Sequence, residues 1–188
     1  MDTVDEELQA LTDRIRAEAG PACEPLLTAP PDELAEVLTA HERPLWAREV
    51  AAFRLGCAGD RRAFETLVLL LNHRDAARCV SAAHALDRLG DPRTARAAAA
   101  LATNPLRTAY AAAAVRLLAR LRAPESAPAL IATLDRLLAP NDPYWRVALA
   151  CVEGLGTLAD PRARPSLTAA QAHPRLATAA TTALRSLP

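Results

Sequence analysis

This sequence contains no lysine, and all 22 of its basic residues are arginine. Aromatic residues are scarce, with two Phe, two Tyr and two Trp among 188 residues, and β-branched residues are few. Ala and Leu, the strongest helix formers, dominate instead, so the composition favours an all-α protein over folds built on strands. We interpret the absence of lysine as codon bias in a GC-rich bacterial genome rather than a demand for guanidinium chemistry.

Long apolar runs are also missing. The first twenty residues are acidic and amphipathic, and no later run reaches the length of a membrane span. Cys23, Cys57, Cys79 and Cys151 form no CxxC motif and no paired ligand spacing, so we expect them to be small hydrophobes rather than disulfides or metal ligands. These absences predict a cytoplasmic protein with no cofactor and no membrane contact.

The net charge of zero conceals an uneven distribution. Residues 1–50 hold 12 acidic residues and four Arg, whereas residues 74–122 hold nine Arg and three acidic residues. A chain without net charge is a poor candidate for non-specific nucleic-acid binding, although its basic middle is suited to an acidic partner.

A short phrase recurs along the chain. Residues 89–95 have the sequence LGDPRTA and residues 158–163 have LADPRA, with fainter copies at 58–63 and 121–126. The anchors of the phrase are Thr28, Asp60, Asp91, Ala123 and Asp160, at spacings of 32, 31, 32 and 37 residues. Apolar residues two, five and eight positions before the later anchors share one helix face, so each anchor ends one helix and begins the next.

The repeat predicts a helix over 3–19 followed by five helix pairs. These pairs are 31–40 with 44–58, 61–72 with 75–89, 92–103 with 106–121, 125–138 with 144–158, and 162–172 with 174–187. A fixed period of this length is typical of a right-handed α-solenoid. We expect one domain over 1–188, in which 1–27 cap the N-terminal end and 28–188 form the repeats.

A second marker lies 13 residues after most anchors, as His41, His73, Asn104 and His173. Each stands in a polar break with Pro nearby in three cases, which indicates the turn within a helix pair. An insertion at 139–143 delays this turn in the fourth pair. Repetition therefore explains the three histidines better than a metal site does.

The pattern Ala-x-x-Leu-x-x-Leu-Gly-Asp-Pro-Arg over 83–93, degraded over 152–162, resembles the short HEAT-like repeat named after phycobilisome lyases. The resemblance covers about residues 28–187. It implies a curved, armadillo-like superhelix whose second helices line a concave face. Proteins of this kind act mostly as protein-binding scaffolds and in a minority as chromophore lyases, and the repeat itself brings no catalytic residues.

Positions three, seven and eleven before each anchor are expected to form the exposed stripe of the second helices. The stripe comprises Glu49, Phe53, Cys57, Val80, His84, Arg88, Ala112, Arg116, Arg120, Leu149, Glu153, Thr157, Thr178, Thr182 and Ser186. From it we expect partner binding by Phe53, His84, Arg88, Arg116, Arg120 and Glu153, with Tyr144 and Trp145 after the insertion. The alternatives are a solvated face of ordinary charges and, for Trp46 and Trp145, packing at helix starts.

Three function classes remain in competition. The favoured one is a non-catalytic, monomeric scaffold that holds a protein or peptide, with acidic residues, on this face. Nucleic-acid binding by the central arginines needs a broad positive surface, which zero net charge disfavours. A lyase-like or other enzyme would need paired acids or an accessible thiol, for which Cys57 is the one candidate.

Overall fold

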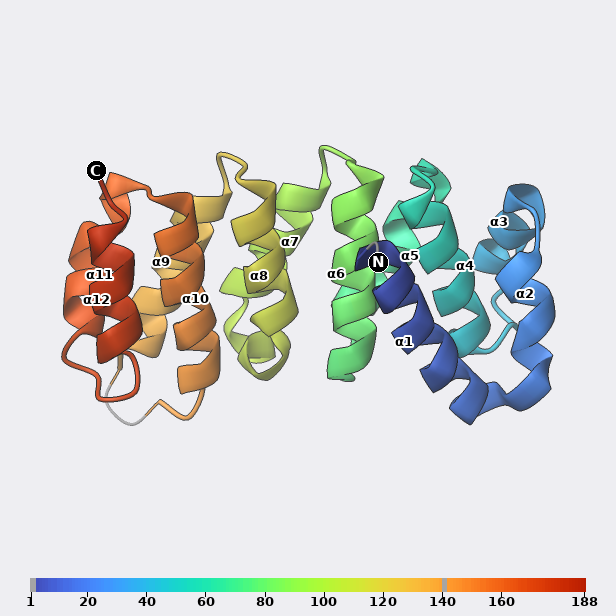
Figure 1. Cartoon of the computed structure of the whole chain (residues 1–188), viewed down its shortest axis with the longest axis horizontal. Coiled ribbons are helices and arrows are strands. Elements are labelled where there is room, and N and C mark those ends of the chain that lie inside the picture. Colours follow the sequence, from blue (N-terminus) through green and yellow to red (C-terminus); the bar gives the residue numbers. More distant parts are fainter. Residues whose placement is uncertain (1–2, 140–141) are drawn as a thin grey trace. The chain divides into compact units, whose positions relative to one another are not determined.

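The computed structural model describes residues 3–139 and 142–188, and within them every regular element is a helix (Figure 1). Contacts divide the chain into two compact units, Met1–Pro92 (unit 1) and Arg93–Pro188 (unit 2). The two residues Pro140 and Asn141 of the predicted insertion lie outside the described residues. No helix in the described part of the chain is long and apolar enough to cross a membrane.

Unit 1 consists of two helix pairs preceded by two further helices. Its elements are α1 (Thr3–Ala19), a 3₁₀ turn (Gly20–Cys23), α2 (Glu24–Thr28), α3 (Pro31–Thr39), α4 (Leu45–Cys57), a 3₁₀ turn (Arg61–Ala63), α5 (Phe64–Leu71) and α6 (Ala76–Leu89). The pairs α3–α4 and α5–α6 pack together, and α4 packs against α6. Val50, Leu55, Leu67 and Leu86 are among the buried residues of this core.

Unit 2 contains three helix pairs in two layers. Its elements are α7 (Thr94–Thr103), a 3₁₀ segment (Pro105–Tyr110), α8 (Ala112–Leu121), α9 (Ser126–Leu137), α10 (Trp145–Leu158), a 3₁₀ turn (Pro161–Ala163), α11 (Arg164–Ala170) and α12 (Ala177–Arg185). The second helices α8, α10 and α12 pack side by side, and α9 packs against both α7 and α11 (Figure 1). Leu118, Leu130, Leu134 and Leu155 are fully buried between the layers.

The predicted helix pairs are confirmed, with differences at their ends. The helix expected over 106–121 starts as the 3₁₀ segment Pro105–Tyr110, because the Asn104 side chain accepts a hydrogen bond from the Leu106 amide at 3.0 Å and favours a tight first turn. The sequence pattern does not predict the short helix α2. The first helix has its expected bounds, but it contacts the second helices of two successive pairs, α4 and α6.

The recurring phrase ends and starts helices as predicted. The carboxylates of Asp60 and Asp160 accept hydrogen bonds from the amides of Arg62 and Arg162 at 3.0 and 2.9 Å, which caps the next turn. Gly59 just before the first of these anchors has φ +79°. Ala159 takes a similar left-handed conformation with φ +54° although it is not glycine. The phrase therefore specifies the junction even where its glycine is lost.

These capped junctions predict a sensitivity to acid. Hydrogen bonds from Arg62 and Arg162 hold the pKa values of Asp60 and Asp160 below the ordinary aspartate value. Because the folded pKa is depressed, the contribution of each carboxylate is present above the unfolded pKa of about 3.9 and is lost as pH falls below it. Asn also caps helices but carries no charge. We expect urea midpoints of D60N/D160N to fall less than wild-type midpoints between pH 6 and pH 3, and equal falls would contradict this.

Candidate functional site

The outer side of α8, α10 and α12 in unit 2 is hollowed by two adjoining clefts. We call this side the unit 2 face. A cleft of about 240 Å³ lies between α8 and α10, and one of about 420 Å³ lies between α10 and α12. Glu153 and Thr157 line both clefts. The unit 2 face is therefore one continuous depression along the second helices.

Small residues make the floor of this depression. A Cβ atom on Gly156 of α10 would lie 2.9 Å from Ala183 Cβ and 3.1 Å from Ala183 Cα of α12. A Cβ on Gly154 would lie 3.1 Å from Ala119 Cβ of α8. Such approach distances leave no room for a side chain, so glycine at these positions lets α10 lie close to both neighbours. The floor stays shallow and apolar while longer side chains rise beside it.

Charged side chains stand at the edge of the α8–α10 cleft. Arg116 and Arg120 lie one turn apart on α8, and Glu153 lies on α10 opposite them. All three are exposed, as the repeat register predicts. Their placement on one cleft is a feature of the structure, and their role in binding stays a prediction.

The corresponding side of unit 1 is covered. Helix α1 runs across α4 and α6 (Figure 1) and buries its own Leu11 and Ile15 there. Glu49 and Phe53 on α4, which the register assigns to an exposed stripe, are each only 1% exposed. The expectation that Phe53 is available to a partner is therefore wrong. It fails because a segment distant in sequence packs over this part of the face.

A buried charge cluster joins α1, α4 and α6. The Glu49 carboxylate accepts hydrogen bonds from Arg14, from Arg78 at 2.6 Å and from the Ser81 hydroxyl at 3.1 Å. Arg78 also donates to Glu18 of α1 at 2.6 Å. Burial alone would lower the pKa of Arg14, but its hydrogen bond to Glu49 and the charge of that carboxylate raise it. These pairings hold α1 on the two second helices of unit 1.

Sequence reasoning does not find this cluster. The register assigns Glu49 to the exposed stripe, and its partners Arg14 and Arg78 lie 35 and 29 residues away along the chain. The one available signal is an unusual acidic residue within an otherwise apolar helix, since a carboxylate at a buried position requires cationic partners.

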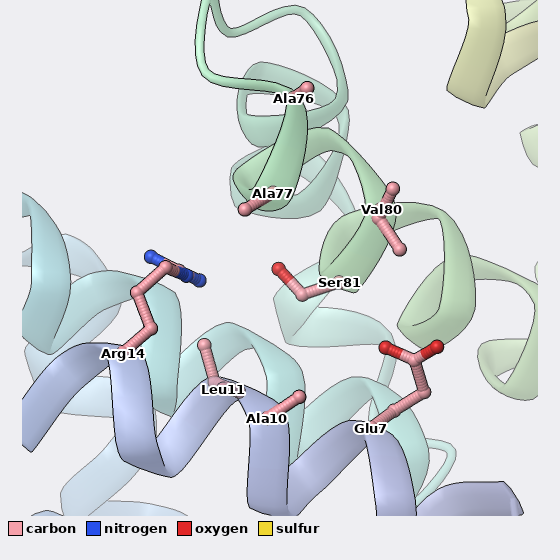
Figure 2. Close-up of a pocket in the computed structure, with 8 residues that line it drawn as sticks. All are labelled: Glu7, Ala10, Leu11, Arg14, Ala76, Ala77, Val80 and Ser81. Atoms are coloured by element: carbon pink, nitrogen blue, oxygen red, sulfur yellow. The ribbon is translucent and has the colours of Figure 1, made fainter.

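A cleft of about 310 Å³ separates α1 from the start of α6 (Figure 2). Leu11 and Ala10 of α1 and Ala77 and Val80 of α6 give it a mostly apolar lining. The guanidinium of Arg14 points toward the α6 side in Figure 2, where it also serves the buried cluster. We therefore regard this cleft as a consequence of how α1 is seated rather than as a separate ligand site.

The remaining predicted residues of unit 1 lie on α6. His84 is half-buried and stacks on Phe53 with ring centroids 5.8 Å apart, so the same contact that buries Phe53 also restrains His84. Arg88 is exposed one turn further along the helix. The structure thus brings His84 and Arg88 together on α6, and separately Arg116, Arg120 and Glu153 on the unit 2 face.

The aromatic pair after the insertion is placed at the start of α10. Trp145 is half-buried, with the guanidinium groups of Arg146 and Arg175 at 4.7 and 4.8 Å from its ring centroid. Such cation–π contacts fix the ring. Tyr144 remains 38% exposed beside it. The geometry supports the packing alternative for Trp145 and leaves Tyr144 accessible.

Cys57, the one thiol considered for chemistry, is a poor nucleophile at neutral pH. Burial raises its pKa to about 11, although the nearby Arg88 opposes that shift. The reactive thiolate is therefore a very small fraction at pH 7. We expect iodoacetamide to label Cys57 in the folded protein far more slowly than a free thiol, with a rate that climbs as pH approaches 11. Rapid labelling at pH 7 would contradict this assignment.

The histidines of the repeat are turn residues, as predicted. The Nδ1 atoms of His73 and His173 accept hydrogen bonds from the amides two residues later, of Asp75 and Arg175, at 3.0 and 3.2 Å. His41 is exposed in the equivalent turn. Among the residues that the structure describes, no three His, Cys, Asp or Glu side chains gather as a metal site would require.

Another hollow on unit 2 competes with the unit 2 face. A shallow depression of about 530 Å³ lies between α7 and α9, lined by the charged Glu125 and by Thr103, Pro128, Ala129 and similar side chains. It is larger but offers a ligand mainly small apolar groups, whereas the unit 2 face combines an apolar floor with charges of both signs. The unit 2 face is therefore the better candidate site.

Comparison with known proteins does not extend this description. The sequence matches no protein-family model, and a search of curated proteins gives no match either.

Proposed function

We propose that this chain is a non-catalytic binding module that holds a protein or peptide on its unit 2 face. The observation that carries the proposal is the continuous depression over α8, α10 and α12, edged by Arg116, Arg120 and Glu153. Helical repeat proteins commonly bind partners along a row of second helices. The two arginines favour a partner that supplies carboxylates, because guanidinium groups pair with them through two parallel hydrogen bonds.

The proposal extends to the architecture. The recurring phrase continues at the same spacing on both sides of residues 92 and 93, where the two units meet in sequence. That regularity, with helix pairs in each unit, supports a HEAT-like α-solenoid. The raised pKa of Cys57 supports a role without covalent chemistry.

The proposal can be tested with ligands selected from a random peptide library, a design that works whatever the natural partner is. Peptides of 20 residues are displayed and selected on the immobilised full chain, and enriched peptides are synthesised for affinity measurements. We expect acidic peptides, bound at least tenfold more weakly by R116E/R120E. Two ion pairs are then exchanged for two repulsions, a change of about 1.4 kcal/mol or more.

The matched control is R96E/R164E, which changes the net charge equally at two exposed arginines on α7 and α11. It should bind the selected peptides as the wild type does, and both variants should keep the wild-type circular dichroism spectrum. Failure to enrich any peptide, or equal losses in the two variants, would overturn the proposal.

A further inference from the structure

The chain already contains one example of a segment bound to second helices. In unit 1, α1 lies across α4 and α6 as an amphipathic helix (Figure 1). Its buried residues Leu11, Thr12 and Ile15 fall on one side, at the spacing of a single helical face. A helix, rather than an extended strand, is therefore a shape that second helices of this sequence can accept.

Charge exchange accompanies that apolar contact. The helix α1 gives an arginine, Arg14, to Glu49 of α4, and a carboxylate, Glu18, to Arg78 of α6. The neighbouring second helices thus present opposite charges, and the docked helix answers each one. Side chains four residues apart on a helix lie one above the other, so Arg14 and Glu18 reach outward from the same edge of α1.

The unit 2 face presents the same kind of pattern, and among the described residues of unit 2 no helix crosses it as α1 crosses unit 1. Arg116 and Arg120 on α8 stand opposite Glu153 on α10, and the floor between them is made of Ala119, Ala150 and Gly154. The floor is apolar and shallow, so the apolar side chains of an incoming helix can reach it. The arginines are spaced by one turn, which matches two carboxylates one turn apart on a helix that lies along α8.

We infer that the unit 2 face binds an acidic amphipathic α-helix of a partner protein. The bound helix places an apolar stripe on the floor, two carboxylates one turn apart against Arg116 and Arg120, and a basic residue against Glu153. This inference rests on the proposed function and narrows it from peptides in general to one shape and one charge pattern.

The test uses three synthetic 18-residue peptides that are held helical by a covalent staple on their outer side. They share one stripe of Leu and Ile and differ at two flanking positions four residues apart, which carry Glu, Gln or Arg. Fluorescence anisotropy measures their affinities for the full chain. We expect the Glu peptide to bind about fivefold more tightly than the Gln peptide, since two exposed ion pairs contribute about 1 kcal/mol together. The Arg peptide should bind most weakly.

The charge-reversed variant R116E/R120E gives the decisive comparison. It should invert the order, so that the Arg peptide becomes the tightest ligand, whereas R96E/R164E should keep the wild-type order. Absence of binding by all three peptides up to millimolar concentration, or an order that R116E/R120E leaves unchanged, would overturn the inference.

Failure of this inference is distinguishable from failure of the proposed function. If peptides selected from the random library lose affinity in R116E/R120E but show no helical circular dichroism when bound, the unit 2 face binds peptides of another shape. The proposed function then stands and the helical ligand is wrong.

Discussion

Replacing Glu49 with Gln is expected to lower the free energy of unfolding of unit 1 by about 3–5 kcal/mol, because it removes the shared carboxylate of a buried charge cluster. Glu49 is 1% exposed and accepts hydrogen bonds from both Arg14 and Arg78. Glutamine keeps the size of the side chain but not its charge, so the two guanidinium groups lose their common counterion. Arg78 has little access to water, with 9% of its side chain exposed.

The two tryptophans allow this loss to be assigned to one unit, because Trp46 lies on α4 and Trp145 on α10. Urea unfolding of E49Q, followed by Trp46 fluorescence in a W145F background, measures unit 1. The matched variant E33Q changes an exposed carboxylate on α3 and should stay within about 0.5 kcal/mol of the wild type. Similar midpoints for E49Q and E33Q would show that the cluster does not hold unit 1 together.

Truncation of Phe53 to Ala should cost unit 1 about 3–5 kcal/mol, the usual cost of removing a buried aromatic side chain. The Phe53 ring is almost inaccessible and stacks on His84 at an interplanar angle of 17°. Its removal would leave a cavity among the helices of unit 1 and would free the imidazole of His84. This result would distinguish a core residue from the exposed ligand contact that the repeat register predicts.

A fitting control for Phe53 is Val80 on α6, which the same register places on the stripe and which is 44% exposed. V80A should change the free energy of unfolding by about 0.5 kcal/mol or less. The same urea titration, read by Trp46 fluorescence, serves both variants. A small change in F53A, comparable with that in V80A, would mean that Phe53 is not a core residue.

The helix pairs could be predicted because their signals are local. Leu86 and Leu155, each five residues before an anchor, lie fully buried, as the apolar stripe indicates. Asp60 and Asp160 cap the turns that follow them because a carboxylate two residues before a free amide is within reach of it. These relations span a few residues and recur, so a single sequence displays them several times.

The cover on unit 1 could not be predicted in the same way. It depends on contacts between α1 and helices 35 to 60 residues later, such as Arg14 with Glu49 and Glu18 with Arg78. Nothing near Glu49 in sequence distinguishes an acidic residue on an open face from one beneath another helix. The register is therefore correct for the exposure of Arg116, Arg120 and Glu153, over which no described helix of unit 2 lies, but not for that of Glu49 and Phe53.

The most direct test of the central claim, that a partner binds the unit 2 face, is photo-crosslinking from two matched threonines. Thr157 on α10 lines the unit 2 face and Thr103 on α7 lines the competing hollow. Both are exposed, and each hydroxyl donates to the carbonyl four residues earlier. With p-benzoylphenylalanine at either position and the Glu peptide as ligand, we predict crosslinking from position 157 and not from position 103. Crosslinking from position 103 alone would contradict the account.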